Sequence, residues 1–155
     1  MYEDLKEHLS KKGNLLSGSW IESNSSYDSD ICKILEMNVS RGRYWDARWK
    51  TYYMEFKKGS SIWLDLVRLS ESFLRINEDA SKETLTLFFI PDKKRERIEE
   101  IICVKTKTII EKVAITEEIA KQLINLNSAV PRSLNAQASL TKKDVRNLSE
   151  FIIHV

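Results

Sequence analysis

The sequence predicts an α/β protein in which helices flank a mixed central β-sheet. Residues 51–57 alternate between two sets of side chains, which is the pattern of a strand with one apolar face. Residues 85–90 form an almost continuous apolar run that stops at Pro91, which is typical of a strand buried on both faces. From residue 51 onward the predicted elements alternate between strand and helix. That order requires a sheet that is at least partly parallel.

Two short helices are predicted before the first strand. Leucines at helical spacing predict an amphipathic helix over residues 2–12. Residues 17–30 are rich in Ser, Asn and Asp and are expected to form a loop. A second helix is expected over residues 30–37, because its apolar side chains lie on one side and Asp30 can serve as the N-cap.

The remaining elements follow from the spacing of apolar residues and from β-branching. Apolar residues repeated every three to four positions predict helices, and β-branched runs predict strands. In chain order we expect a strand over residues 51–57, a helix over 62–76, a strand over 85–90, a helix over 93–104, a strand over 108–115, a helix from Thr116 to Leu126, a polar loop over 127–140, a short helix from Thr141 and a last strand over 150–155.

The composition fits one domain spanning residues 1–155. Of the 155 residues, 42% are hydrophobic and 31% are charged, and 4 Gly and 2 Pro are too few for a collagen-like or linker-rich chain. No apolar run is long enough to span a membrane, and the polar N-terminus lacks the apolar region of a secretory signal. We therefore expect a cytoplasmic protein without a membrane partner.

Cysteine and histidine are too scarce for several common kinds of site. Cys32 and Cys103 lack the Cys-x-x-Cys spacing of a structural zinc site, and two cysteines do not make a disulfide framework. His8 and His154 lie near the two ends of the chain, which disfavours a histidine metal site or a Ser/His catalytic pair. Two thiols in a reducing compartment are the simplest interpretation.

Positive charge is concentrated in two segments although the net charge is only +2. Residues 39–58 contain six Lys or Arg and two Asp or Glu, whereas residues 1–38 contain four basic and seven acidic side chains. Residues 127–143 contain three basic side chains and no acidic one. Local positive charge with interleaved aromatic residues indicates a polyanionic partner, although a solvated charged face is the simpler alternative.

Three charged residues near the middle of the chain form the most informative pattern. Glu55 and Lys57 are two residues apart on a predicted strand and therefore share a face. Asp46 precedes Glu55 by nine residues, enough for a turn and a neighbouring antiparallel strand. Two converging carboxylates form a hard-oxygen site suited to Mg²⁺, and a lysine beside them can orient a water molecule that attacks a phosphodiester.

This pattern resembles the Asp…(Asp/Glu)-x-Lys signature of the PD-(D/E)xK nuclease superfamily. Trp45 stands where many members have Pro before the first Asp. The resemblance covers about residues 30–126 and includes the order of elements in small type II restriction endonucleases. It implies a restriction-endonuclease-like fold with the signature on two adjacent strands.

The same resemblance implies a role for each matching residue. Asp46 and Glu55 correspond to the metal ligands, and Lys57 corresponds to the catalytic lysine. Many members add an acidic residue from a preceding helix, for which Glu36 is the best match.

The activity implied is that of a Mg²⁺-dependent endonuclease that hydrolyses phosphodiester bonds in double-stranded DNA, specifically a type II restriction enzyme. A chain of this length has no room for a separate recognition domain, and cutting both strands of a palindromic duplex calls for a homodimer. Two alternatives remain: a structure-selective nuclease similar to Holliday-junction resolvases, and a non-catalytic nucleic-acid-binding or regulatory protein.

Basic side chains near the motif are expected to contact phosphates, and the acid-free segment 127–143 is expected to contact base edges. The expected DNA-binding residues are Arg41, Arg43, Arg48, Lys50, Lys58, Arg132, Asn135, Gln137, Lys142 and Lys143.

Each of these residues also has a structural interpretation. Glu55 and Lys57 can form an exposed ion pair on an edge strand, with Asp46 in a turn. Trp45, Trp49 and Tyr52 can be ordinary core residues, with at least two of them buried. The segment from residue 127 can be an ordinary surface loop.

Overall fold

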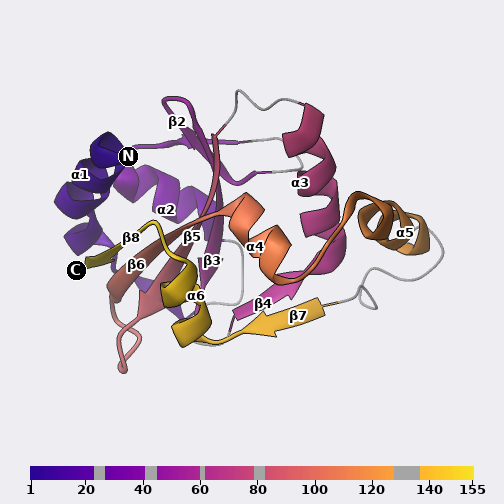
Figure 1. Cartoon of the computed structure of the whole chain (residues 1–155). Coiled ribbons are helices and arrows are strands. Elements are labelled where there is room, and N and C mark those ends of the chain that lie inside the picture. The colour runs from indigo at the N-terminus through magenta and orange to yellow at the C-terminus, as the bar shows by residue number, and fades with distance from the viewer. Residues whose placement is uncertain (23–26, 41–44, 60–61, 79–82, 128–136) are drawn as a thin grey trace.

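A computed structural model describes residues 1–22, 27–40, 45–59, 62–78, 83–127 and 137–155. Its centre is a six-stranded sheet with the strand order β1-β2-β3-β5-β6-β8 (Figure 1). The strands are β1 (Asn38–Val39), β2 (Ala47–Trp49), β3 (Tyr52–Lys58), β5 (Glu83–Pro91), β6 (Ile98–Lys105) and β8 (Phe151–His154). β3 and β5 are parallel and all other neighbours in this sheet are antiparallel, so the predicted mixed central sheet is confirmed.

Helices cover both faces of this sheet. The helices are α1 (Glu3–Lys12), the 3₁₀ turns η1 (Gly13–Leu15) and η2 (Ser19–Ile21), α2 (Asp28–Leu35), α3 (Leu66–Glu78), α4 (Thr106–Lys112), α5 (Glu117–Asn127) and α6 (Lys142–Leu148). The segments before β1 pack on one face, and α3 to α6 pack on the other. A two-stranded sheet of β4 (Ile62–Asp65) and β7 (Gln137–Leu140) lies on the second side.

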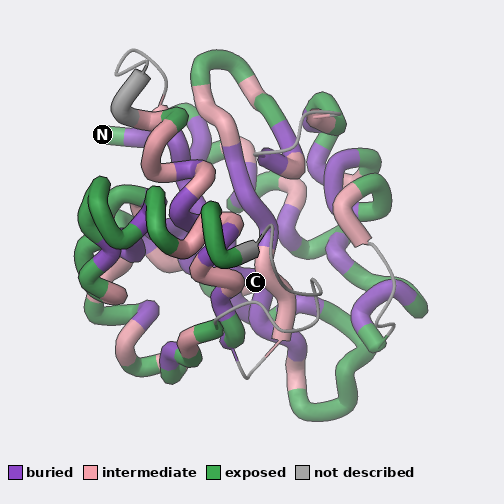
Figure 2. The backbone as a smooth tube through the Cα atoms, turned by 90° about the vertical axis from the view of Figure 1, so that its right-hand side faces the viewer, coloured by how far each residue is buried: buried purple, intermediate pink, exposed green. Residues whose placement is uncertain are grey.

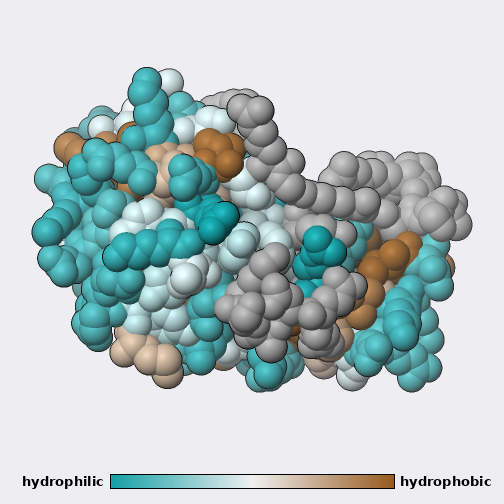
Figure 3. Space-filling model, turned by 90° about the horizontal axis from the view of Figure 1, so that it is seen from above, coloured by the Kyte–Doolittle hydropathy of each residue, from teal (hydrophilic) through white to brown (hydrophobic). Residues whose placement is uncertain are grey.

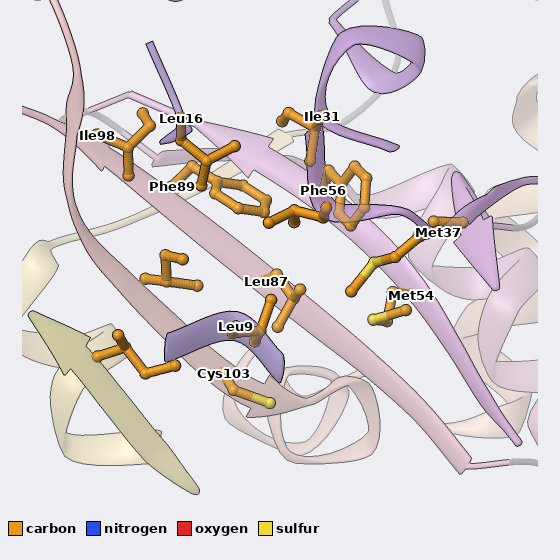
Figure 4. Packing of buried hydrophobic residues seen from close by; sticks show 14 of the residues in the cluster. Leu9, Leu16, Ile31, Met37, Met54, Phe56, Leu87, Phe89, Ile98 and Cys103 are labelled. Atoms are coloured by element: carbon orange, nitrogen blue, oxygen red, sulfur yellow. The ribbon is translucent and has the colours of Figure 1, made fainter. Parts of the chain in front are cut away.

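β5 contributes to the cores on both faces. Leu85, Leu87 and Phe89 belong to the cluster that contains α1 and α2, whereas Phe88 and Ile90 belong to the cluster on the opposite side. Figure 4 shows Phe89 beside Phe56 of β3, and their ring centroids are 5.3 Å apart in an edge-to-face arrangement. The prediction that residues 85–90 form a strand buried on both faces is confirmed.

The surface is mainly polar outside this interior. Figure 2 shows buried residues running through the middle of the molecule and exposed residues on its outer helices and turns. The face shown in Figure 3 is mostly hydrophilic, with small hydrophobic areas. Within the described ranges, none of the helices has the length and apolar character needed to cross a membrane.

For two segments the predicted type of secondary structure is wrong. Residues 93–104 were expected to form a helix, but β6 occupies most of this segment and pairs antiparallel with β5. Residues 108–115 were expected to form a strand, but α4 occupies Thr106–Lys112. Both segments are rich in Ile and Val, whose spacing fits either element over so short a length. Tertiary packing decides: β6 pairs with β5 on one side and β8 on the other, and α4 buries Ile109 and Ile110 against the sheet.

Residues 62–76 also differ from the expected single helix. Ile62 and Leu64 are buried on one side of β4, and α3 begins only at Leu66. β4 pairs with β7, which lies within the segment expected to be a loop. In the N-terminal part of the chain, α2 begins at Asp28, so Asp30 is not its N-cap as expected.

Candidate functional site

The antiparallel pairing of β2 and β3 brings Asp46 beside Glu55. Asp46 lies directly before β2, and its backbone N–H donates to the carbonyl oxygen of Met54 at 2.9 Å. Its carboxylate Oδ2 accepts the backbone N–H of Phe56 at 2.7 Å. The side chain of Asp46 is therefore held against the residue that separates Glu55 from Lys57.

Glu55 and Lys57 share one face of β3, as predicted. Lys57 Nζ lies 3.5 Å from Glu55 Oε1, and only 6% of the Glu55 side chain is exposed. β3 lies between β2 and β5, so the interpretation of this pair as an exposed ion pair on an edge strand is wrong. Of the aromatic residues expected in the core, Trp45 is buried, whereas Trp49 and Tyr52 are half-buried.

Arg68 adds a second cation to this group. Its Nη2 donates to Asp46 Oδ1 at 3.2 Å, and its Nε lies 3.4 Å from Glu55 Oε1. Asp65 Oδ1 accepts the backbone N–H groups of Val67 and Arg68 at 2.9 and 3.2 Å, which caps the first turn of α3. This cap fixes the backbone from which Arg68 reaches over β3.

A small pocket lies beside these charges. Its polar lining consists of Glu55, Lys57, Asp65, Arg68 and Thr86. The pocket is therefore formed where β3, β5 and the start of α3 meet, and it lies against the buried carboxylate of Glu55.

Asp28, at the start of α2, supplies a third carboxyl group. A hydrogen bond joins it to Asp46, and burial together with the Asp46 charge raises the pKa of Asp28 to about 7. Asp28 therefore holds its proton up to a higher pH than an ordinary aspartate does. Burial also raises the pKa of Glu55, and the charges of Lys57 and Arg68 oppose this effect.

The donor atoms suit a hard divalent cation that also uses ligands from a substrate. Asp46 and Glu55 offer carboxylate oxygens, the class that Mg²⁺ prefers. In the described part of the chain, however, no three His, Cys, Asp or Glu side chains lie close enough together to hold a metal ion. A cation at this site would therefore depend on the two carboxylates of Asp46 and Glu55 and would take its other ligands from water or phosphate, as Mg²⁺ commonly does.

Glu36 is not brought to this cluster. It follows the end of α2 in the left-handed conformation, with φ of 54°, and its exposed carboxylate pairs with Lys12 Nζ at 2.8 Å. The hydrogen bond and charge of Lys12 lower the pKa of Glu36. The carboxyl group that α2 directs to Asp46 is instead that of Asp28.

Three expected phosphate-binding residues lie on or near β2 and β3. Arg48 and Lys50 are exposed, and each stacks on an aromatic ring, Arg48 on Tyr53 and Lys50 on Trp49. Lys58 differs, because its Nζ donates to the carbonyl oxygen of Trp20 at 2.6 Å, and burial lowers its pKa. The hairpin therefore presents Arg48 and Lys50 to solvent and turns Lys58 inward.

Of the expected base-contacting residues, Gln137 has the clearest relation to the site. It lies opposite Asp65 in the β4–β7 ladder, so the start of β7 is next to the pocket. Lys142 and Lys143 are the first residues of α6. The other expected DNA-binding residues, Arg41, Arg43, Arg132 and Asn135, lie outside the described residues.

Comparisons with known proteins identify no relative of this chain. No protein-family model, curated protein or solved structure matches the chain.

Sequence reasoning missed Asp28 and Arg68. Asp28 lies four residues before Cys32 and seven before Leu35, so it shares the buried face of α2. A helix that begins at residue 28 instead of residue 30 would have placed Asp28 on the same face as these buried residues. Arg68 follows a possible Asp65 cap by three residues, but no local pattern shows that it reaches β3.

Proposed function

We propose that this protein is a Mg²⁺-dependent endonuclease that cleaves double-stranded DNA, and specifically that it is a type II restriction enzyme. The observation that carries the proposal is the meeting of Asp46 and Glu55 from neighbouring strands, with Lys57 on the same face. This is the arrangement that the resemblance to PD-(D/E)xK nucleases implies. The mixed sheet, with α3 between β3 and the parallel strand β5, supports the proposal, whereas β6 and α4 follow β5 in the reverse of the order that the resemblance implies.

In this proposal each charged residue has a distinct task. Asp46 and Glu55 would hold the divalent cation, which when bound would supply Lewis-acid activation of the scissile phosphate and of a water molecule. Lys57 orients the attacking water and offsets negative charge that develops on the phosphate. Asp28, rather than Glu36, takes the role of the acidic residue from the preceding helix, because it contacts Asp46.

DNA would be held by basic side chains around this site. Arg48 and Lys50 are exposed on or beside β2 and suit contacts with phosphates. Gln137, beside the pocket, suits contact with a base edge. We propose a homodimer because one site cuts one strand, and a cytoplasmic location because Cys32 and Cys103 are both free thiols.

A second function has its own support. Arg68 already pairs with both Asp46 and Glu55, so the cluster is charge-compensated without a metal ion. That observation favours a non-catalytic nucleic-acid-binding or regulatory protein in which the same residues stabilise the fold.

Incubation of phage DNA and supercoiled plasmid with the protein, in Mg²⁺, Ca²⁺ or a chelator, tests the proposed activity. Discrete fragments in Mg²⁺ alone indicate a restriction enzyme, and cutting confined to branched DNA indicates a structure-selective nuclease. Intact DNA in all conditions, with a shift of the DNA on a native gel, indicates the binding protein. Glu117→Gln and Lys121→Ala, which change an exposed ion pair on α5, are matched controls for changes at Glu55 and Lys57.

A further inference from the structure

Arg68 contacts the carboxylate oxygens that a metal ion would need. Asp46 Oδ2 accepts the Phe56 N–H, and Oδ1 accepts the bond from Arg68. On Glu55, Oε1 is the oxygen approached by both Arg68 Nε and Lys57 Nζ. A cation bound between the two carboxylates through these oxygens would compete directly with the guanidinium.

The guanidinium is an imperfect partner for this position. Arg68 Nε is buried, yet no acceptor among the described residues is aligned to receive its N–H. The contacts are one from Nη2 to Asp46 and one from Nε towards Glu55, instead of a two-bond fork on a single carboxylate. A buried donor without an acceptor is unfavourable, so moving this side chain outward relieves one defect.

The surroundings allow the side chain to move while the backbone stays. Asp65 caps the first turn of α3 through the N–H groups of Val67 and Arg68, and this holds the backbone of Arg68. The Arg68 side chain is 32% exposed, against 6% for Glu55, so it lies at the mouth of the cluster. An outward movement of the guanidinium would need rotation about its side-chain bonds only.

We propose that Arg68 is the resident cation of this site in the metal-free protein, and that a divalent cation binds by displacing its guanidinium from Asp46 and Glu55. The identity of the incoming cation rests on the proposed function. Arg68 is thus a positioning residue that pairs with both the Asp46 and the Glu55 carboxylate until the cation arrives.

The test is a calorimetric titration of Mn²⁺ and of Ca²⁺ into the protein without DNA. We compare the natural protein with Arg68→Met and with Arg75→Met, which removes the same charge from an exposed position on the same helix. Arg68→Met is expected to bind Mn²⁺ about tenfold more tightly, since no guanidinium has to leave. Arg75→Met is expected to bind like the natural protein.

Thermal unfolding in a chelator provides a second measurement. Arg68→Met is expected to melt at a lower temperature than the natural protein in the chelator and to recover more of its stability when Mn²⁺ is added. Arg68→Gln keeps a donor for Asp46 without the charge, and it replaces the Met variant if that variant does not fold.

The outcomes separate this inference from the proposed function. Equal or weaker Mn²⁺ binding by both Arg68 variants overturns the displacement, even if the natural protein cleaves DNA. The absence of Mn²⁺ binding in every variant overturns it as well. Tighter Mn²⁺ binding by the Arg68 variants supports the displacement. If the natural protein nevertheless leaves phage DNA intact in Mg²⁺, only the nuclease assignment is rejected.

Discussion

The carboxylate of Asp46 accepts the backbone N–H of Phe56 at 2.7 Å, and Phe56 separates Glu55 from Lys57. A side chain from the start of one strand is thereby tied to the backbone of the next. The bond holds the Asp46 carboxylate beside the backbone that carries Glu55 without any bound ion. It also gives Asp46 a structural role that can be separated from its chemical one.

The first prediction separates these two roles by substitution. Asp46→Asn is expected to abolish DNA cleavage with a small loss of stability, since the amide oxygen can still accept the Phe56 N–H. Asp46→Ala is expected to abolish cleavage and to lower the free energy of unfolding by about 1–3 kcal/mol, because Phe56 N–H and Arg68 lose an acceptor. Plasmid nicking and urea unfolding measure the two effects. Equal stability of the Asn and Ala variants would contradict this role of the hydrogen bond.

A second prediction concerns Lys57. Lys57→Ala is expected to abolish cleavage but to retain DNA binding in Ca²⁺, because the lysine acts on the water and phosphate during chemistry. Gel-shift and plasmid assays on the same preparation make the comparison, with Lys121→Ala as the control. Cleavage by Lys57→Ala at the rate of the natural protein would remove Lys57 from the site.

The third prediction is a pH dependence of stability due to Asp28 in the metal-free protein. The folded state raises the pKa of Asp28 from 3.8 to about 7, so it holds this proton more tightly than the unfolded chain does. The stabilisation is present at low pH and is lost as the pH rises towards and through about 7.

Asp28→Asn removes the titrating group. When the pH is raised from about 5 to about 8, the free energy of unfolding is therefore expected to fall less in this variant than in the natural protein. After allowance for solvent screening at this half-exposed position, the difference is expected to be about 1–2 kcal/mol. Urea unfolding in a chelator at both pH values measures it, with Glu117→Gln as the control. The same loss in Asp28→Asn as in the natural protein would falsify the assignment.

A fourth prediction distinguishes phosphate contacts from base contacts. Arg48→Ala is expected to weaken binding to all duplexes and to reduce the salt dependence by about one unit of slope. Gln137→Ala is expected to cost about 1–3 kcal/mol on the preferred sequence and little on random DNA. Binding isotherms in Ca²⁺ at several salt concentrations separate the two. Equal losses on both duplexes for Gln137→Ala would exclude β7 from sequence recognition.

The last prediction is the oligomeric state. A homodimer is expected, free or on DNA, since each site serves one strand of a two-fold symmetric duplex. Sedimentation velocity with and without an oligonucleotide duplex measures this. A monomer in both samples would contradict the proposed mode of double-strand cleavage.

The sequence best predicts those strands that a local pattern of side chains defines. The alternation along β3 and the apolar run of β5 are local patterns, and both strands form as predicted. The sequence predicts a helix where β6 forms and a strand where α4 forms. Ile and Val suit either element, and only the pairing with β5 decides between them.

The site divides in the same way. The meeting of Asp46, Glu55 and Lys57 could be predicted because one hairpin carries all three. Asp28 and Arg68 come from helices before and after that hairpin, and their approach depends on how these helices pack on the sheet. No spacing within a short segment contains that information.

The location of β3 within the sheet has a consequence for the exchange of backbone amide hydrogens with solvent. Glu55 is paired with Thr86 of β5, a strand buried on both faces, so this region is expected to exchange only through global unfolding. Asp46 adjoins β2, which has three residues and whose outer neighbour β1 has two, so β1 and β2 are expected to open without global unfolding. The two carboxylates are therefore expected to differ in protection, and opening of β1 and β2 is expected to set how often Asp46 separates from Glu55.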